Sequence, residues 1–560
     1  MHSPPAAAGR RSPPRDPGDA TCARHTLVRI FNPPLLISAA PMRAGRSSQT
    51  FGPWRTSAAR VEECRNYTTA YTAYSYTQPA DSASIASSAA RTMANIAKPC
   101  LVEFIGTFFL TLTIGTAAGQ GSSLAPLAIG STLVCAIYWG GHMSGANFNP
   151  AVSLAVCIRG KLTPVLCGCY MLAQFAASAV AFAAVSALLP RVGSPVPGSG
   201  VEIGAAFAAE LVLTFALCHT VLHTATSSAG AGNSYFGLAI GFTVLSGAIS
   251  VGGVSGGAFN PAVGVLSLLN GLNVTTVLEL YFLAPLLGGT LAAGLFHLTH
   301  PHETSDGRVE KPAFADCAVE FVGTFMLCFT ISLAASASNT SGLAPVSIGA
   351  MLMAQVYAGG PTSGGHYNPA VSLGVLVRAR AGSIDFGMAK AVAYILTQSL
   401  AAAAASAAAR ALLGSGVGHP EVGEGVEVHA AWLAEFLGTL LLVSVVLQVA
   451  TAPATKGNSF FGLAIGFTVL SMAVSLGPIS GGAFNPAVGL LTTLARGDPF
   501  EAATTSLSVY LTACPAAGLL AGLLFPLLTN GGEHASPHEA ERTALNVIDD
   551  KQEGDEELGR

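Results

Sequence analysis

The chain has 560 residues, of which 51% are hydrophobic and only 10% are charged, and its formal net charge at pH 7 is −4. This composition excludes a soluble enzyme and is typical of a membrane protein with many spans. The 11 cysteines show no metal-ligand spacing and are interpreted as small core residues. We expect no metal, no cofactor and no nucleic-acid partner.

Residues 1–97 form a basic N-terminal segment that differs from the rest of the chain. It holds eleven arginines against five acidic residues, with many Ser, Pro and Ala and no apolar run long enough for a span. An organelle transit peptide and a disordered basic tail share this composition, so both interpretations stay open. Met93 lies just before the first span and offers a second start of translation, which would leave the preceding residues outside the mature protein.

Apolar runs follow at regular intervals from residue 99 onwards and predict an all-α membrane protein. A membrane-spanning helix needs about 20 apolar residues, and twelve runs are of this order. The first six lie near 99–118, 124–141, 164–189, 203–224, 235–252 and 277–298. The second six lie near 314–335, 343–359, 387–413, 429–450, 460–477 and 503–528.

The tripeptide Asn-Pro-Ala occurs four times between these runs. The copies are Asn149-Pro150-Ala151, Asn260-Pro261-Ala262, Asn368-Pro369-Ala370 and Asn485-Pro486-Ala487. Asn is a good N-cap and Pro suits the first helical position, so each copy predicts the start of a helix. The apolar run that follows is too short to cross a bilayer, which indicates a re-entrant half-helix. Two half-helices that meet at the midplane would place two Asn amides and two positive helix ends on a channel, which favours neutral molecules over cations.

Internal repeats show that the chain is a tandem duplication. The segment Phe236–Ser246 recurs letter for letter at Phe461–Ser471. A finer repeat opens each three-span unit with a glutamate, at Glu103, Glu210, Glu320 and Glu435. Because three is odd, successive units lie inverted in the membrane, and because six is even, the two halves lie parallel. The predicted domains are 98–299 and 314–529, with a linker at 300–313 and an acidic tail at 530–560.

The four glutamates need partners because an ionisable group in a span costs roughly 2.5 to 3.5 kcal/mol or more. One interpretation is proton coupling, and the other is a structural acceptor for the irregular backbone of the re-entrant segments. Four copies at one repeat position favour the structural acceptor.

Basic residues predict the orientation of the chain. They gather on the side shared with the N-terminus, at Arg159, Lys161, Arg308, Lys311, Arg378, Arg380, Lys390 and Lys456. The positive-inside rule makes this side cytoplasmic, so both termini and the linker are expected in the cytoplasm.

These motifs resemble those of the aquaporins, the major intrinsic protein family, over essentially all of residues 98–529. The resemblance rests on the segments 144–152 and 255–263, on their second-half counterparts, and on the glutamate that opens each unit. It implies two tandem bundles, each with six transmembrane helices, two re-entrant half-helices and one pore. Members of the family form rings of four bundles, so two copies of this fused chain are expected to make an assembly with four pores.

The resemblance also places a selectivity constriction near the outer mouth of each pore. Family members typically build it from an aromatic residue, a histidine, a small residue and an arginine. The corresponding residues here are Ile129, Ala248, Gly257 and Val263 in the first half, and Ile348, Ala473, Gly482 and Val488 in the second. Both constrictions are therefore expected to be wide and apolar. Gly264 and Gly489 stand where glycerol-conducting members usually carry an Asp, which speaks against a preference for glycerol.

The sequence thus predicts a passive channel for water and small uncharged solutes such as urea, glycerol, ammonia or peroxide, and no enzymatic activity. Two rival interpretations stay open. A secondary active transporter also uses inverted repeats and broken helices. A non-conducting structural membrane protein would keep the fold but close the pores.

Overall fold

The computed structural model describes residues 82–303, 310–380, 384–494 and 500–529, and these residues form helices and loops without a strand. The predicted N-terminal segment and the acidic tail lie largely outside the described residues. The first helix begins earlier than the predicted domain boundary at 98. It runs from Ser82 to Gly119 with Pro99 in its interior, so the N-terminal part of this helix precedes the first apolar run.

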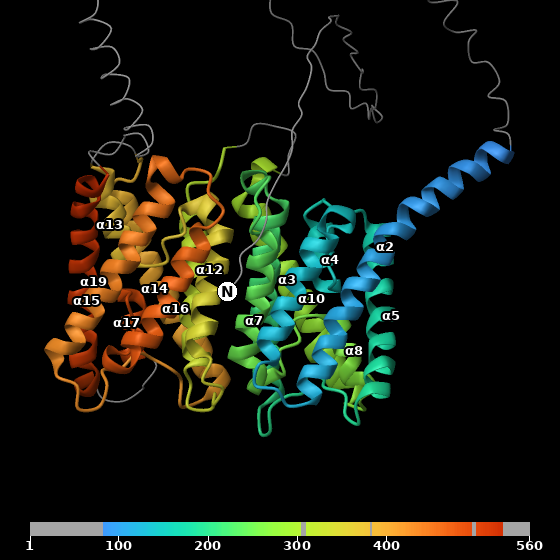
Figure 1. Cartoon of the computed structure of the whole chain (residues 1–560), viewed down its shortest axis with the longest axis horizontal. Helices are drawn as coiled ribbons and strands as arrows, with labels where there is room; N and C mark the ends of the chain where they lie inside the picture. Colours follow the sequence, from blue (N-terminus) through green and yellow to red (C-terminus); the bar gives the residue numbers. More distant parts are fainter. Residues whose placement is uncertain (1–81, 304–309, 381–383, 495–499, 530–560) are drawn as a thin grey trace, which may run out of the picture. The chain divides into compact units, whose positions relative to one another are not determined.

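The first half folds into a bundle of six long helices and two short ones (Figure 1). Its elements are α2 (Ser82–Gly119), α3 (Ala125–Ser144), α4 (Pro150–Ile158), α5 (Pro164–Leu188), α6 (Ile203–Val221) with the π-helical turn η1 (Leu222–Thr226), η2 (Ser228–Gly230), α7 (Phe236–Ser255), α8 (Pro261–Leu269), and α9 (Val274–Val277), η3 (Leu278–Leu283) and α10 (Ala284–Thr299), which form one continuous span. The predicted half-helices are α4 and α8. The turn η4 (Pro301–Glu303) leads out of the bundle.

The second half repeats this arrangement. Its elements are α11 (Ala315–Ala334), α12 (Ala344–Ser363), α13 (Pro369–Ala379), α14 (Met388–Leu413), α15 (Val428–Val446) with η5 (Leu447–Thr451), η6 (Pro453–Thr455), α16 (Phe461–Ser480), α17 (Pro486–Gly489), α18 (Leu491–Leu494) and α19 (Phe500–Leu528). The half-helix α13 is continuous, whereas the other half-helix is interrupted at Leu490 between α17 and α18.

Ten of the described helical segments are long and apolar enough to cross a membrane. The two remaining long helices, α3 and α12, also have 20 residues, but their Gly, Ser and Pro content lowers their mean hydropathy. About 20 residues suffice to cross the hydrocarbon core. The predicted fold class, two tandem bundles of six long helices and two half-helices each, is confirmed.

Glycines allow helices to approach closely inside each bundle. A Cβ atom at Gly241 of α7 would lie 2.7 Å from the carbonyl oxygen of Gly130 in α3, closer than real Cβ contacts. The second bundle repeats this contact between Gly466 of α16 and Gly349 of α12. Small residues at these crossings bring the helix backbones together, which is a common way to pack helices within a membrane.

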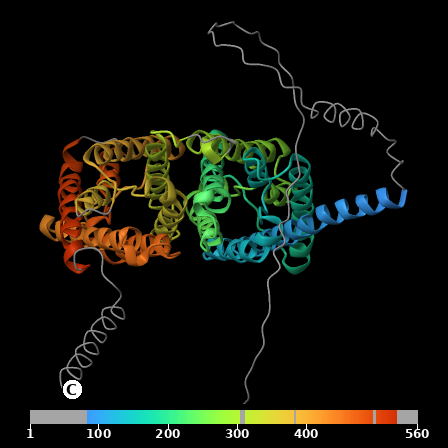
Figure 2. The ribbon, with the colours of Figure 1, turned by 90° about the horizontal axis from the view of Figure 1, so that it is seen from above.

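The two bundles contact each other along a seam, which we define as the contact of α7 with α12 (Figure 2). At its centre the Ser246 hydroxyl donates to the carbonyl oxygen of Ser347 at 2.9 Å, and the hydroxyls of Ser250 and Ser347 are 2.9 Å apart. At one end the rings of Tyr235 and Tyr357 are stacked. Buried hydroxyl pairs of this kind satisfy polar groups that have no water partner in a membrane.

Candidate functional site

Each Asn-Pro-Ala motif begins a half-helix. The side-chain oxygen of Asn149 accepts a hydrogen bond from the backbone N–H of Ala151 at 2.8 Å, and Pro150 takes the first helical position of α4. The other motifs repeat this cap with Asn260 and Ala262 (2.9 Å), Asn368 and Ala370 (2.8 Å), and Asn485 and Ala487 (2.9 Å). Each motif Asn therefore uses its oxygen as a cap and keeps its amide N–H groups for other partners.

The two half-helices of each bundle meet tip to tip through an exchange of amides. The amide nitrogen of Asn149 donates to the carbonyl oxygen of Phe259 at 2.8 Å, and that of Asn260 donates to the carbonyl oxygen of Phe148 at 3.0 Å. The second bundle pairs Asn368 with Phe484 at 2.8 Å and Asn485 with Tyr367 at 2.9 Å. Because an amide nitrogen carries two N–H donors, each Asn retains one for a molecule in the cavity.

The residue before each motif Asn has a left-handed backbone that non-glycine residues rarely adopt. The φ angles are 49° for Phe148, 50° for Phe259, 50° for Tyr367 and 45° for Phe484. Glu103 holds the first of these turns, because its carboxylate accepts from the backbone N–H groups of Asn147 at 2.9 Å and Phe148 at 2.6 Å. It also accepts from the hydroxyl of Ser144 at 2.7 Å.

The other three glutamates bind the corresponding turns in the same way. Their backbone donors are Ala258 and Phe259 for Glu210, His366 and Tyr367 for Glu320, and Ala483 and Phe484 for Glu435. All four glutamates are fully buried, and none of them lines the cavities described below. This placement suits an acceptor for irregular backbone.

Sequence reasoning missed a second set of residues that fixes the same turns. In each three-span unit a tyrosine of the third long helix donates its hydroxyl to the carbonyl oxygen of the serine that precedes the turn. The pairs are Tyr170 and Ser144, Tyr281 and Ser255, Tyr394 and Ser363, and Tyr510 and Ser480, at 2.6 to 2.8 Å. Four tyrosines at the same place in the repeat were a readable signal in the sequence.

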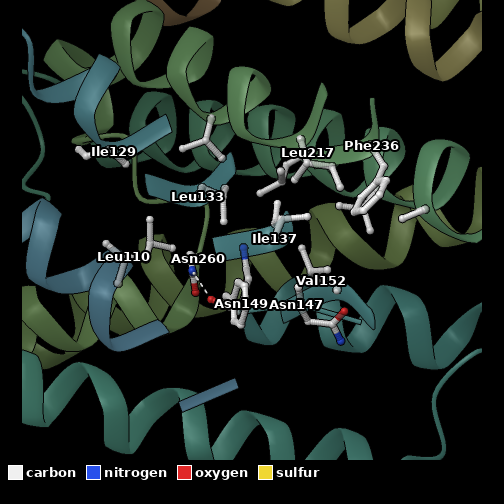
Figure 3. Close-up of a pocket in the computed structure, with 18 of the residues that line it drawn as sticks. Leu110, Ile129, Leu133, Ile137, Asn147, Asn149, Val152, Leu217, Phe236 and Asn260 are labelled. Atoms are coloured by element: carbon white, nitrogen blue, oxygen red, sulfur yellow. Dashed lines mark hydrogen bonds between the residues drawn. The ribbon is translucent and has the colours of Figure 1, made fainter. Parts of the chain in front are cut away.

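A cavity of about 540 Å³ runs through the first bundle (Figure 3). Both motif Asn side chains line it, and Figure 3 shows them between Ile129 at one end and Phe236 at the other. All four predicted constriction residues line the same cavity, namely Ile129, Ala248, Gly257 and Val263. The rest of the wall is mainly aliphatic, with side chains such as Leu133 and Leu217. The motif amides, with Asn147 close by, are thus the polar groups midway along a mainly apolar channel.

The second bundle has a smaller cavity of about 160 Å³ in the same place. It too is lined by both motif Asn residues, and by all four predicted constriction residues, namely Ile348, Ala473, Gly482 and Val488. A separate cavity of about 900 Å³ lies beyond it toward the linker. His366 lines both cavities and stands where the first half has Asn147, so a bulkier ring occupies the boundary between them.

Two constriction positions require glycine. Gly257 has a φ of 67° and Gly482 a φ of 65°, in the left-handed region. A larger side chain at either position would strain the backbone in addition to filling the channel. The alanines Ala248 and Ala473 line the same two cavities from ordinary helical positions in α7 and α16, so they can be enlarged without that strain.

Comparison with known proteins tests the resemblance to the major intrinsic protein family. The family model of the major intrinsic proteins matches residues 90–297, 237–362 and 312–525. The chain belongs to the major intrinsic protein family. The first and last matches cover the two bundles, and the middle one covers the end of the first bundle and the start of the second, as repeated units require.

Several members of the family are similar to one half of the chain. Aquaporin NIP1-4 of Oryza sativa subsp. japonica is 37% identical over 212 residues, which is 36% of this chain and 72% of that protein. The glycerol uptake facilitator protein-like 6 of Lactiplantibacillus plantarum is 33% identical, over 36% of this chain and 92% of its own length. A crystal structure of the aquaglyceroporin from Plasmodium falciparum matches 36% of this chain and 95% of its own, at 21% identity and a TM-score of 0.33. Membership of the family, together with the ten described segments that can cross a membrane, makes this major intrinsic protein an integral membrane protein with many spans.

Proposed function

We propose that each bundle contains one pore through which water and small uncharged solutes cross the membrane passively. The observation that carries this proposal is the pair of motif amides on an apolar channel, each held by a cap and by the facing half-helix. These fixed N–H donors offer hydrogen bonds to a neutral molecule, and none of the residues that line the two cavities is an Asp, Glu, Lys or Arg that could bind a coupling ion. In the first pore the N-termini of α4 and α8 point at the same place, and their partial positive charge disfavours protons and cations.

The constriction residues indicate solutes larger than water. Ile129, Ala248, Gly257 and Val263 offer no charge and no side-chain hydrogen-bond donor, and the second pore has the same four residue types. An apolar ring without an arginine selects by size alone. Urea, glycerol, ammonia and peroxide are the candidates, and one relative carries the name of a glycerol uptake facilitator. The absence of an Asp after Val263 and Val488 argues that glycerol is not preferred over urea.

The described loops support the predicted orientation. We call the side of the bundles on which residues 300–303 and 310–314 lie the linker side. Its loops and adjoining helix ends carry Arg159, Lys161, Lys311, Arg380, Lys390 and Lys456, whereas the opposite side carries Arg191 and Arg410. The positive-inside rule then puts the linker side, and with it both ends of the chain, in the cytoplasm.

Two chains are proposed to close a ring of four bundles. Inside the chain the seam buries Ser246 and Ser250 of α7, whereas the corresponding Ser471 and Ser475 of α16 are exposed. Likewise Tyr357 of α12 is 1% exposed, and its counterpart Tyr138 in α3 is 42% exposed. The faces of α16 and α3 thus repeat the two sides of the seam without a partner among the residues that the structure describes. A second copy offers both complementary faces.

Flux through purified protein tests the proposed function. Vesicles with the full chain should shrink faster than empty vesicles when sucrose is added outside. With urea as the osmolyte they should shrink and then swell again as urea enters. A secondary transporter would need an ion gradient for urea entry, and a structural protein would match the empty vesicles, so either result would overturn the proposal. The comparisons support neither alternative.

A further inference from the structure

The segment that joins the two halves carries a buried acid that contacts the first pore. Glu303 ends the turn η4, directly after the last helix of the first bundle. Its carboxylate oxygen Oε2 lies 2.8 Å from the Nη2 atom of Arg159, and both side chains are at most 4% exposed. Arg159 caps the C-terminal end of half-helix α4, and its guanidinium lies 4.5 Å from the ring centre of Phe296. A cation at a helix C-terminus is favourable, so this pair fixes the end of the half-helix.

The same carboxylate also holds the loop between α6 and α7. Its Oε1 atom accepts from the hydroxyl of Ser227 at 2.8 Å, and Oε2 accepts from the backbone N–H of Ser228 at 3.1 Å. We call Glu303, Arg159, Ser227 and Ser228 the latch. Burial alone raises the pKa of Glu303, but the hydrogen bonds from the two serines and the charge of Arg159 outweigh it and hold this pKa below its ordinary value. The latch is therefore charged at neutral pH.

The loop that the latch holds forms the linker-side mouth of the first pore. Ser227, Gly230, Ala231, Gly232 and Asn233 line the 540 Å³ cavity. The segment from Ser228 to Gly232 consists of serine, alanine and glycine only, so its own side chains provide little packing. The side-chain amide of Asn233 donates to the carbonyl oxygens of Thr224 and Gly230 and holds the end of this segment, whereas its start at Ser227 and Ser228 is held by Glu303.

The latch has no counterpart in the corresponding loop of the second pore. The second half keeps the stacked pair of Arg378 and Phe525, with 4.3 Å from the guanidinium carbon to the ring centre. However, Ala452 and Pro453 stand where the first half has Ser227 and Ser228, so neither a hydroxyl nor a backbone N–H is offered at these places. Residues 229–233 also line the 900 Å³ cavity on the linker side of the second bundle, so a change in the latch should affect the first pore more strongly than the second.

The linker also contacts the second bundle next to the latch. The Nε2 atom of His300 lies 3.0 Å from the hydroxyl of Thr362, and the Lys311 ammonium donates to the carbonyl oxygen of Thr362 at 2.6 Å. Lys311 and Lys390 both pair with Asp316. The covalent connection between the halves is thus anchored on both bundles, which gives Glu303 a fixed position from which to hold the loop.

We propose that Glu303 is a positioning residue of the first pore, which fixes the loop 227–233 beside the linker-side mouth and keeps that mouth open. This inference rests on the proposed function, since it assigns a role toward one of the two pores. Without the carboxylate, the small-residue loop loses two hydrogen bonds and the buried Arg159 loses its partner. The loop then samples positions across the mouth, and fewer molecules pass.

The test uses full chains in which one pore is plugged. Ala473→Trp plugs the second pore and leaves the first to be measured, and Ala248→Trp does the reverse. In the first background Glu303→Gln should lower water flux by about threefold or more, because a neutral partner no longer holds the loop and the mouth is open for a smaller fraction of the time. In the second background it should lower flux by a clearly smaller factor, because the second pore keeps its own loop at 452–458. Glu310→Gln removes the same charge from an exposed residue of the linker and should have no effect in either background.

Two further measurements separate a latch from general destabilisation. Ser227→Ala removes a single hydrogen bond without stranding a charge and should lower flux through the first pore by a smaller factor. Backbone amides in 227–235 should exchange with deuterium faster in Glu303→Gln than in Glu310→Gln. An equal loss of water flux in both backgrounds would contradict the proposed role of Glu303. Unchanged water flux together with unchanged amide exchange would contradict it as well. If the singly plugged chains do not conduct at all, the proposed two-pore function is wrong instead.

Discussion

Tyr235 of the first bundle stacks on Tyr357 of the second, with ring centroids 4.1 Å apart and 9° between the ring planes. The Tyr357 hydroxyl also lies 2.9 Å from the carbonyl oxygen of Ser459, which precedes α16. The Tyr357 ring at this end of the seam is thereby held in place by a hydrogen bond within the second bundle. The counterparts of the stacked pair are Phe460 and Tyr138, both exposed, so the same aromatic contact is available between chains.

The first prediction concerns this assembly. Light scattering in detergent should give a protein mass of two chains. Ala128 in α3 is exposed and corresponds to the buried Ser347 of the seam, so Ala128→Trp should wedge the intermolecular contact apart and give single chains. Leu172→Trp on the exposed face of α5 is the control and should keep the wild-type mass. A wild-type mass of one or four chains would contradict the proposed ring.

The second prediction is that the two pores conduct independently. Ala248→Trp and Ala473→Trp should each remove part of the water flux of the vesicles, and the double variant should remove nearly all of it. The two single variants are expected to lose different shares of the water flux, because the cavity of the first pore has about 540 Å³ and that of the second about 160 Å³. If either single change abolished all flux, the pores would not be independent.

The third prediction follows from Val263 and Val488. A guanidinium at each constriction would narrow it and place several fixed donors there. The double change Val263→Arg and Val488→Arg should reduce urea flux by about tenfold or more and water flux much less, because size exclusion acts first on the larger molecule. Val263→Leu with Val488→Leu serves as a control for bulk without charge. Parallel losses of water and urea flux in the arginine variant would refute selection at this ring.

The fourth prediction addresses the buried glutamates. Glu210→Gln replaces an acceptor oxygen with an amide that faces the N–H groups of the turn, where Phe259 donates at 2.6 Å. Loss of a buried charged acceptor should cost about 3 kcal/mol of stability, so the melting temperature in detergent should fall markedly. Glu279→Gln makes the same chemical change at an exposed position and should melt like the wild type. Similar melting of the two variants would speak against the structural role.

The fifth prediction is a pH dependence of stability. Burial lowers the pKa of His300 to about 4, and the charges of Lys311 and Arg159 act in the same direction while Glu303 opposes them. Between this value and its ordinary pKa of about 6.5 the unfolded chain binds more protons than the folded one. The contribution of His300 is therefore complete above about pH 6.5 and is lost as the pH falls toward 4.

We expect that His300→Gln reduces the fall in melting temperature between about pH 7.5 and about pH 4.5, because Gln binds no proton. His142→Gln makes the same chemical change at an exposed histidine and serves as the matched control. An unchanged pH dependence in His300→Gln would show that other groups cause it.

The sequence predicted the helices well because each is an apolar run bounded by clear signals. The half-helix at Asn149 begins with an N-cap and a proline, and α4 starts at Pro150 as these residues require. The early start of α2 at Ser82 was not predicted, because the residues before 98 are polar and no apolar run extends into them. The interruption at Leu490 was not predicted either, since the same ten-residue motif segment, Ser255–Gly264 and Ser480–Gly489, precedes a continuous helix in the first bundle and a broken one in the second.

Long-range contacts were beyond sequence reasoning for a different reason. Glu303 and Arg159 are 144 residues apart, and although Arg159 is repeated as Arg378, no sequence pattern connects it to Glu303. The difference between the two cavities likewise depends on how a single ring, His366, packs against Phe386 and Tyr394. Periodicity predicts which face of a helix is buried, but it does not give the space left between side chains.

The seam within the chain also constrains the composition of any ring that two chains form. Because α7 of the first bundle already contacts α12 of the second, the free faces on α3 and α16 can only continue the ring with the other kind of pore. The two kinds therefore alternate, with unlike pores as neighbours and like pores diagonally opposite. If the two bundles were separate subunits, they could also form rings in which all four pores are of the same kind. They could likewise form rings in which like pores are neighbours. Covalent fusion removes these alternatives and fixes an equal number of the two kinds of pore in every assembly.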